Sequence, residues 1–326
     1  MKDIISISKT PLRVSFVGGG TDMPYFFEKY NGSTISCAID RYIYVTAKFH
    51  NNHNQKYRLN YSTTENANSL NRIKNLRVKN VIRMLNIKKP LYINTFADVP
   101  ANTGLGSSSS FTVGLIKALS KLKNKNYSKK EVAEMAFKIE KKITNNSVGK
   151  QDHYVSSYGG INFIKYQRNG VRVFPLRLSK KNEQMLFNKM MLVWTKKSRS
   201  AANILKDQKI NLKKNIFLLK KMNQYTLEFK KEILGKKINS KKLFDIINNT
   251  WKIKKNLSKL ITNKKIDRLV SSLEKNKAKV GKLLGAGNGG FVLIHIEGRD
   301  KKKLLKILNK KVCLDFNLEK NGSLIL

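Results

Sequence analysis

The chain has 326 residues and carries 66 Lys and Arg against 21 Asp and Glu, a formal net charge of +45 at pH 7. Its length allows a substantial core and predicts two domains. The apolar runs are short and interrupted, so none could span a bilayer, and the first residues lack the apolar block of a signal peptide. Two cysteines are too few for a disulfide framework. We therefore expect a cytoplasmic globular protein with no membrane partner.

The excess of lysine has two interpretations. It fits a protein that binds nucleic acid, an anionic membrane or phosphorylated small molecules. It also fits solvated helix faces in a chain biased toward Lys and Asn, because the lysines are spread over 117–130, 206–242 and on to 311 without interleaved aromatic residues. We favour the second interpretation and expect no specific nucleic acid partner. A basic RNA-binding module is the alternative.

The first part of the chain is predicted to be rich in strands. β-branched and aromatic residues indicate strands at 4–7, 13–17, 42–49 and 91–95. A glycine-rich turn at 18–24 breaks this pattern, and a helix is expected to begin near Pro24. Ser128 and Glu131 then form a capping box ahead of apolar residues at helical spacing, on a helix that carries Glu140.

The later part alternates differently. Strands are predicted at 161–166, 171–174 and 190–194, followed by helices from about residue 200 to residue 276. A strand at 291–296, a helix at 301–308 and a strand at 312–316 complete the pattern. The change in character near residue 180 predicts one domain over 1–180 and a second over 181–326.

The most informative segment is 100–110, Pro-Ala-Asn-Thr-Gly-Leu-Gly-Ser-Ser-Ser-Ser, which leads directly into the apolar run 111–122. Gly104 and Gly106 permit backbone angles closed to other residues, and a helix starting after them presents free N–H groups and the positive end of its dipole. Such a start binds an anion, and the serine hydroxyls add donors or a magnesium ligand. The segment predicts a phosphate-binding loop. A plain serine-rich N-cap is the alternative.

A later glycine-rich loop, 285–290, matches G-x-G-x-x-G. A dinucleotide fingerprint follows a strand and opens a helix, whereas here we expect a helix before the loop and a strand after it. The phosphate-binding motif G-x-x-x-x-G-K-[ST] is missing, because Gly149-Lys150 is followed by Gln151 and the Gly-Lys pair at 281–282 by Leu. Protein-kinase signatures are missing too.

Four segments carry a family resemblance: 11–22 (Pro-Leu-Arg-Val-Ser-Phe-Val-Gly-Gly-Gly-Thr-Asp), 100–109, 149–152 (Gly-Lys-Gln-Asp) and 285–290. In order and spacing they resemble the motifs of the GHMP kinases, over essentially the whole chain. The resemblance implies a two-domain α+β fold, the first domain similar to a ribosomal-protein domain and the second a ferredoxin-like α/β plait with extra helices. It also implies phosphoryl transfer to an alcohol, with ATP and Mg²⁺ at the site.

Finer details resemble the heptose 7-phosphate kinases within this superfamily. They are Gly-Gly-Gly-Thr-Asp at 18–22, where galactokinases have Gly-Glu-His-Thr-Asp, Gly-Lys-Gln-Asp-His-Tyr at 149–154, and Ser-Arg-Ser-Ala at 198–201. The resemblance implies transfer to the anomeric hydroxyl of D-glycero-D-manno-heptose 7-phosphate, giving the 1,7-bisphosphate for capsule or lipopolysaccharide synthesis. Two residues depart from the family. Gln is common where this chain has His153, and Gly or Phe is usual where it has Asn288. A kinase of another sugar, such as fucose or galactose, is the rival.

The resemblance assigns the chemistry to a few residues. Asp152 matches the aspartate that accepts the proton of the attacking hydroxyl or orients it, and Arg13 matches the basic residue that keeps it ionised. Glu140, twelve residues before Asp152, matches the magnesium carboxylate, and Ser108 completes that site. Alternatively, Asp152 is a loop or capping aspartate, Arg13 a surface arginine and Glu140 a solvated glutamate. Either neighbouring serine could replace Ser108.

The resemblance also implies binding residues, a sugar phosphate and ATP as partners, and a homodimer as a possible assembly. For ATP the residues are Pro100, Asn102, Gly104, Leu105, Gly106, Ser107, Ser108 and Ser109. For the sugar they are Gly20, Thr21, Asp22, Gly160, Gly287 and Asn288. For the sugar's own phosphate the candidates are Arg199, whose planar fork suits a phosphate, and Lys254 and Lys255, one helical turn beyond Trp251. Asp22 could instead cap the following helix, and either lysine could belong to a solvated face.

Overall fold

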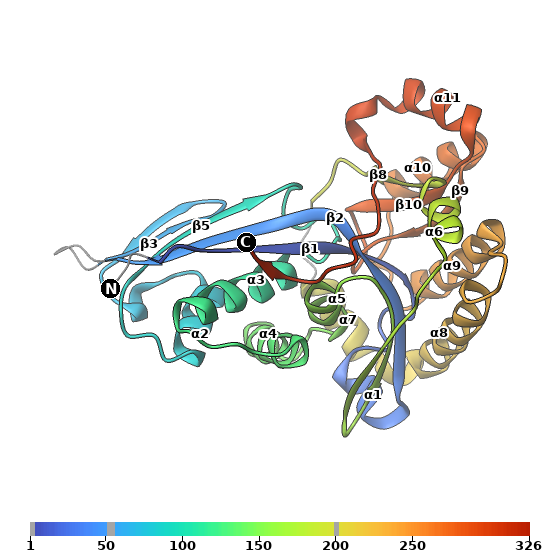
Figure 1. Ribbon diagram of the computed structural model, residues 1–326. Coiled ribbons are helices and arrows are strands. Elements are labelled where there is room, and N and C mark those ends of the chain that lie inside the picture. The colour runs from blue at the N-terminus through green and yellow to red at the C-terminus, as the bar shows by residue number, and fades with distance from the viewer. Residues whose placement is uncertain (1–3, 51–55, 199–201) are drawn as a thin grey trace.

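The computed structural model describes residues 4–50, 56–198 and 202–326. Two β-sheets, each with helices packed on it, lie next to each other in the molecule (Figure 1). The first sheet and its helices fill the left of that view, and the second sheet lies to the right with the helices that follow residue 202. The α+β fold of two layered units predicted from the sequence is confirmed.

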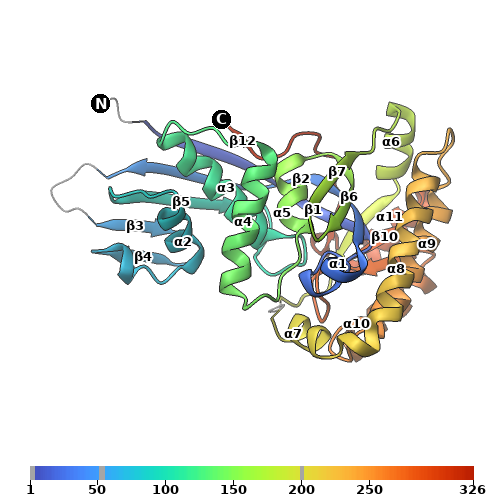
Figure 2. The ribbon, with the colours of Figure 1, turned by 90° about the horizontal axis from the view of Figure 1, so that it is seen from below.

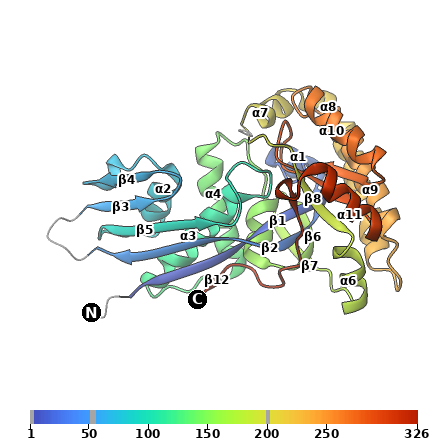
Figure 3. The same cartoon turned by 90° about the horizontal axis from the view of Figure 1, so that it is seen from above.

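The first sheet is built on two long antiparallel strands. Figure 3 shows its strands β12 (Leu324–Ile325), β1 (Ser6–Val17), β2 (Gly32–Phe49), β5 (Leu91–Ala97), β3 (Tyr57–Asn60) and β4 (Thr64–Ala67) in this order, with β6 (Ile161–Gln167) and β7 (Gly170–Pro175) beside β2. The far edge of β2 pairs with β5 through residues 43–49 and with β6 through residues 32–37. A shift in register between Pro11 and Leu12 of β1 comes directly before Arg13, and such bulges often re-aim a side chain next to a site.

Four helices cover one face of this sheet: α2 (Leu76–Met84), α3 (Ser107–Leu122), α4 (Lys129–Ile143) and α5 (Gln151–Tyr158) (Figure 2). Helix α3 packs so closely on β1 that a Cβ on Gly114 would lie 2.7 Å from Thr10 Oγ1. The predicted capping box is confirmed at the start of α4, where Ser128 Oγ accepts from Glu131 N at 3.2 Å and Glu131 Oε2 accepts from Ser128 N at 2.8 Å. Helices α3, α4 and α5 contact one another, and α3 and α5 pack on β1, so they form a layer behind that strand.

The second sheet has the strand order β11-β8-β10-β9, with all neighbours antiparallel. Its strands are β8 (Met190–Trp194), β9 (Lys279–Leu283), β10 (Phe291–His295) and β11 (Cys313–Leu314), preceded by α6 (Lys180–Phe187). Its helices are α7 (Ala202–Ile210), α8 (Leu212–Ile233), α9 (Ser240–Lys255), α10 (Lys264–Lys275) and α11 (Gly298–Leu308). A β-α-β-β-α-β chain order with extra helices in its first crossover is the expected ferredoxin-like plait.

The structure changes several predicted elements. The strands expected at 4–7 and 13–17 belong to one strand, β1. Pro11 lies within it without breaking a backbone hydrogen bond to β12, because β12 pairs only with Ser8 and Lys9. Three groups of elements were not predicted: strands β3, β4, β9 and β12, helices α2, α5 and α6, and the short turns of 3₁₀ helix at Leu70–Arg72 and Lys310–Val312. Helix α1 (Pro24–Tyr30) begins where expected.

The expectation that a helix directly precedes the loop 285–290 is wrong. Strand β9 lies between α10 and this loop, so the loop joins two antiparallel strands. The strand sequence Lys-Val-Gly-Lys-Leu is short and holds a glycine and two lysines, so it lacks the β-branched alternation that marks a strand. The loop is still no dinucleotide fingerprint, because no helix follows it.

The end of the chain returns to the first sheet. Leu324 and Ile325 pair with β1, and Leu318 forms an isolated bridge with Ile39 of β2. Phe16 of β1 and Phe229 of α8 stack with ring centroids 5.6 Å apart, so the apolar core is continuous between the two sheets. The division near residue 180 stays a prediction. Within the described ranges, no helix is both long and apolar enough to cross a bilayer.

Candidate active site

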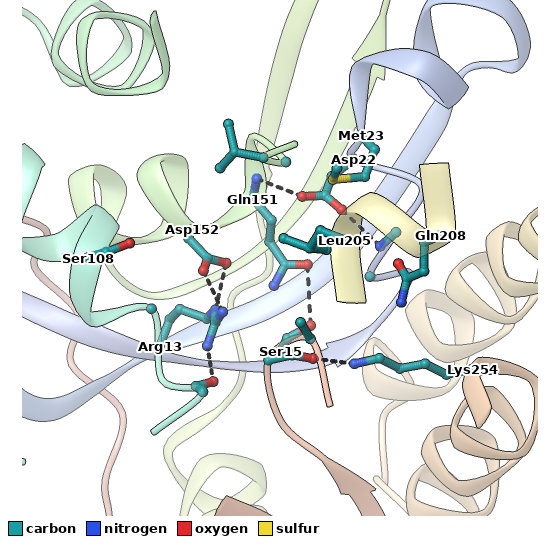
Figure 4. Close-up of a pocket in the computed structure, with 18 of the residues that line it drawn as sticks. Arg13, Ser15, Asp22, Met23, Ser108, Gln151, Asp152, Leu205, Gln208 and Lys254 are labelled. Atoms are coloured by element: carbon teal, nitrogen blue, oxygen red, sulfur yellow. Dashed lines mark hydrogen bonds and ion pairs between the residues drawn. The ribbon is translucent and has the colours of Figure 1, made fainter. Parts of the chain in front are cut away.

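A cavity of about 190 Å³ lies where the two units meet, and elements from both sheets line it (Figure 4). The first sheet contributes β1, the glycine turn that follows it, the start of α3 and the start of α5. The second unit contributes α7, α9, β9 and the loop after β9. Its lining includes Arg13, Ser15, Gly20, Asp22, Asn102, Gly104, Gly106, Ser107, Ser108, Gln151, Asp152, Gln208, Lys254 and Lys282. A site made by both units can hold two substrates against each other.

The predicted phosphate-binding loop leads directly into a helix. Gly106 is the N-cap of α3 with φ of 76°, and Gly104 has φ of 83°, both in the region that favours glycine. A Cβ on Gly104 would lie 2.6 Å from Leu284 O, and one on Gly106 would lie 3.2 Å from Arg13 Cγ. The loop therefore needs glycine both for its angles and for its approach to the neighbouring chain. The unpaired backbone N–H groups at the start of α3 are suited to bind an anion.

Arg13 and Asp152 form a two-pronged ion pair inside the cavity. Arg13 Nε donates to Asp152 Oδ1 at 2.7 Å and Arg13 Nη2 donates to Asp152 Oδ2 at 2.5 Å. Arg13 Nη1 also donates to Gly104 O at 2.5 Å, as the dashed lines in Figure 4 show. The Asp152 side chain keeps 27% exposure, and it lies at the start of α5, where the helix dipole favours a negative charge. The arginine thus fixes the carboxylate relative to the phosphate-binding loop.

Asp22 is the second carboxylate in the cavity. Asp22 Oδ1 accepts from Gly20 N at 2.9 Å and Asp22 Oδ2 accepts from Gln151 N at 3.2 Å, so the backbone holds its orientation. Burial raises the pKa of Asp22, and the charge of Asp152 raises it further, while the two backbone hydrogen bonds act against both. Two carboxylates that line one cavity suit the hydroxyl groups of an acceptor.

Glu140 lies behind the loop, almost completely buried. Its Oε2 accepts from Ser109 Oγ at 3.2 Å and Ser108 Oγ at 3.4 Å, and its Oε1 accepts from Arg77 Nε at 2.8 Å. Nε2 of the buried His153 lies 3.3 Å from Oε2. Burial alone would raise the pKa of the Glu140 carboxyl, but the contacts with His153 and Arg77 outweigh it and hold the pKa below its ordinary value.

Glu140 and Ser108 carry oxygen atoms of the kind that magnesium binds in proteins. Among the described residues no three His, Cys, Asp or Glu side chains gather into a metal cluster. Mg²⁺, however, is often held by one or two carboxylates together with substrate phosphates. Glu140 with the Ser108 hydroxyl at the phosphate-binding loop supplies hard oxygen ligands of that kind.

Lysines line the side of the cavity that belongs to the second unit. Lys254 is 7% exposed and its ammonium donates to Gly285 O. Lys255, its neighbour on α9, points elsewhere: its Nζ lies over the Trp251 ring, 5.9 Å from the centroid, and it does not line the cavity. Consecutive helix positions differ by about 100°, so one helix face cannot present both. Arg199 lies outside the described residues.

Several predicted binding residues do not line the cavity. Thr21 is buried and its hydroxyl is engaged with the backbone of Gly18 and Ser33. Gly160 binds the returning chain end through a hydrogen bond from its N–H to Glu319 O at 2.7 Å. The other predicted site residues that the structure describes and that do not line the cavity are Pro100, Leu105, Ser109, Glu140, Gly287 and Asn288.

Four lining residues with polar side chains were not predicted as site residues: Ser15, Gln151, Gln208 and Lys282. Ser15 and Gln151 stand next to predicted residues, and Ser15 Oγ donates to Gln151 Oε1 at 3.2 Å. Alternation along β1 would have found Ser15, because residues two apart share a strand face. Gln208 and Lys282 have no such signal, since folding brings them to the cavity from distant parts of the chain.

Comparison with known proteins assigns the family. A family model described as GHMP kinases N terminal domain matches residues 71–160. The chain is 30% identical over 333 residues to the D-glycero-alpha-D-manno-heptose 7-phosphate kinase of Campylobacter jejuni, and this match covers 97% of both chains. The chain belongs to the GHMP kinases. As a GHMP kinase it is a phosphotransferase that acts on an alcohol, with ATP as the donor.

Other GHMP kinases resemble it over most of its length. The mevalonate kinase of Methanocaldococcus jannaschii is 31% identical over 244 residues, which are 74% of this chain and 73% of that relative. Among solved structures, the D-glycero-D-manno-heptose 1-phosphate kinase of Bacteroides thetaiotaomicron superposes with a TM-score of 0.79 over 99% of both chains at 24% identity, which shows the shared fold.

Proposed function

We propose that this GHMP kinase transfers the γ-phosphoryl group of ATP to the anomeric hydroxyl of D-glycero-D-manno-heptose 7-phosphate, giving the 1,7-bisphosphate. The match over 97% of both chains to a kinase of that name carries the proposal. The chemistry of the cavity agrees with it, since Asp22 and Asp152 suit sugar hydroxyls and Lys254 adds a cation for the 7-phosphate. The product would supply nucleotide-activated heptose for a surface polysaccharide.

The loop 100–110 binds the phosphates of ATP in this proposal. The backbone N–H groups that open α3 and the hydroxyls of Ser107 and Ser108 donate to phosphate oxygens. Glu140 and Ser108 would hold Mg²⁺, which would supply charge neutralisation to the phosphates of ATP. Arg77 donates to Oε1 of Glu140 and His153 lies against Oε2, and these two contacts orient the carboxylate.

Asp152 acts on the acceptor. Its carboxylate accepts the proton of the anomeric hydroxyl as the bond from oxygen to phosphorus forms and the bond to the leaving ADP breaks. The ion pair with Arg13 keeps the Asp152 oxygens in place, and because Arg13 also binds Gly104 O, acceptor and donor are aligned by one side chain. Asp22 binds a further hydroxyl of the sugar.

A panel of acceptors tests the substrate. ADP formation is measured in a coupled assay with heptose 7-phosphate, heptose 1-phosphate, galactose, fucose and mevalonate at equal concentrations. We expect the highest kcat/KM with heptose 7-phosphate and a product phosphorylated at the anomeric carbon, identified by ³¹P NMR. Faster turnover of an unphosphorylated hexose would contradict the proposal.

Mevalonate kinase activity is the second candidate. The 31% identity to an archaeal mevalonate kinase supports it, although that match leaves about a quarter of this chain uncovered. Mevalonate is a carboxylate with few hydroxyls, so it would use the cavity lysines and leave Asp22 without a partner. Preferred turnover of mevalonate in the same panel would establish this function in place of the first.

A further inference from the structure

Lys282 is a buried lysine in the floor of the cavity. It lies on β9 and is 2% exposed, and its side chain lines the cavity with Arg13 and Asp22. Its ammonium donates to Phe16 O of β1 at 3.3 Å. An ammonium has three donors, and within the described chain this is the one hydrogen bond that Lys282 forms. Two donors therefore remain for a ligand.

Such a placement costs free energy in the folded protein. Burying a charged group is unfavourable unless it is paired, and Lys282 forms no ion pair with any described residue. Burial lowers the pKa of Lys282 to about 7, the charge of Arg13 acts in the same direction, and Asp22 opposes both. Groups kept in unfavourable surroundings are concentrated at functional sites.

We propose that Lys282 binds the phosphoryl acceptor, with its ammonium donating to oxygen atoms of adjacent hydroxyls close to the hydroxyl that Asp152 deprotonates. The inference rests on the cavity being the acceptor site, as proposed above. A polyol with neighbouring hydroxyls supplies the two acceptors that the free donors need. Lys282 is thereby a specificity-determining residue for the sugar.

The charges around Lys282 agree with this role. The charged groups that line the same cavity are Arg13 of β1, Asp22 of the glycine turn, Asp152 of α5 and Lys254 of α9. Arg13 is paired with the carboxylate of Asp152, whereas Lys254 and Lys282 each donate to a backbone carbonyl. Lys282 is the more deeply buried of these two lysines.

The variant Lys282→Met keeps the length of the side chain and removes the ammonium. We expect its KM for heptose 7-phosphate to rise at least about 10-fold, because a hydrogen bond from a charged donor is lost, while its KM for ATP stays within about two-fold. We also expect its melting temperature at pH 7 to equal or exceed that of the wild type. A purely structural lysine would give the opposite result, a lower melting temperature with an unchanged KM.

The control is Lys279→Met on the same strand, where a half-buried lysine pairs with Asp245 at 2.6 Å. Its KM for the sugar should stay within about two-fold of the wild-type value. If the wild type does not turn over heptose 7-phosphate, the proposed substrate is wrong, and Lys282→Met is assayed with the panel acceptor that is turned over. An unchanged acceptor KM, a raised KM for ATP alone, or failure of Lys282→Met to fold would each overturn the role of Lys282.

Discussion

Two buried lysines, Lys150 at the start of α5 and Lys282 in the cavity, differ in how the protein pairs their charge. Lys150, at the start of α5, donates to both Glu134 oxygens at 2.6 and 2.9 Å, and its Nζ lies 4.8 Å from the centroid of Phe137. Lys282, in the cavity, has one carbonyl partner at 3.3 Å. The first lysine is completed by the protein and the second is left open. The difference indicates that the pair of Lys150 and Glu134 serves stability, whereas Lys282 in the cavity serves binding.

The strongest test of the cavity side is Asp152→Asn. The amide cannot accept the proton of the acceptor, so we expect kcat to fall by about a hundredfold to ten-thousandfold while the melting temperature changes little. The coupled assay and a thermal melt measure both. Asp300→Asn on α11 is the matched control and should turn over normally. Undiminished turnover of Asp152→Asn would remove this carboxylate from the reaction.

Substitution of Lys150 should change the stability of the protein and not its activity. Burial raises the pKa of Glu134, but the hydrogen bonds from Lys150 and Tyr154 lower it by more than burial raises it. The folded protein therefore favours the ionised carboxylate. Lys150→Met leaves that carboxylate without its cation, and we expect a loss of about 2 kcal/mol in the free energy of unfolding, measured by urea denaturation. The KM values should stay near those of the wild type. A wild-type denaturation midpoint would show that the pair does not stabilise α5.

The open lysine makes a different prediction, in pH dependence. The pKa of Lys282 is lowered from 10.5 to about 7, so between these values the unfolded chain binds a proton that the folded chain does not. Wild-type stability should therefore rise from pH 7 toward pH 10 relative to Lys282→Met, by at most about 1.4 kcal/mol per pH unit. Urea denaturation of both proteins at several pH values measures the difference. Parallel stability curves would contradict the burial of this ammonium.

The two lysines also show what the sequence could predict. Asp152, Arg13 and Gly106 belong to local motifs, and the structure brings them together as those motifs imply. Lys282 was not predicted as a site residue, because only folding brings β9 against Phe16, 266 positions earlier in the chain. Thr21 is the converse case: it stands in a motif, but the motif cannot say that its hydroxyl would bind the backbone of Gly18.

Helix α9 offers the smallest and most local comparison. Lys254 lines the cavity and is nearly buried, whereas Lys255 lies over Trp251 outside it. We expect Lys254→Met to lower kcat/KM for the sugar phosphate about tenfold, because a cation next to the loop 285–290 is lost, and Lys255→Met to change it less than about two-fold. If Lys254 binds the phosphate of the sugar, Lys254→Met should lower kcat/KM less for an unphosphorylated sugar than for the sugar phosphate. Equal effects of the two substitutions would mean that long-range charge, and not the position of Lys254 in the cavity, attracts the substrate.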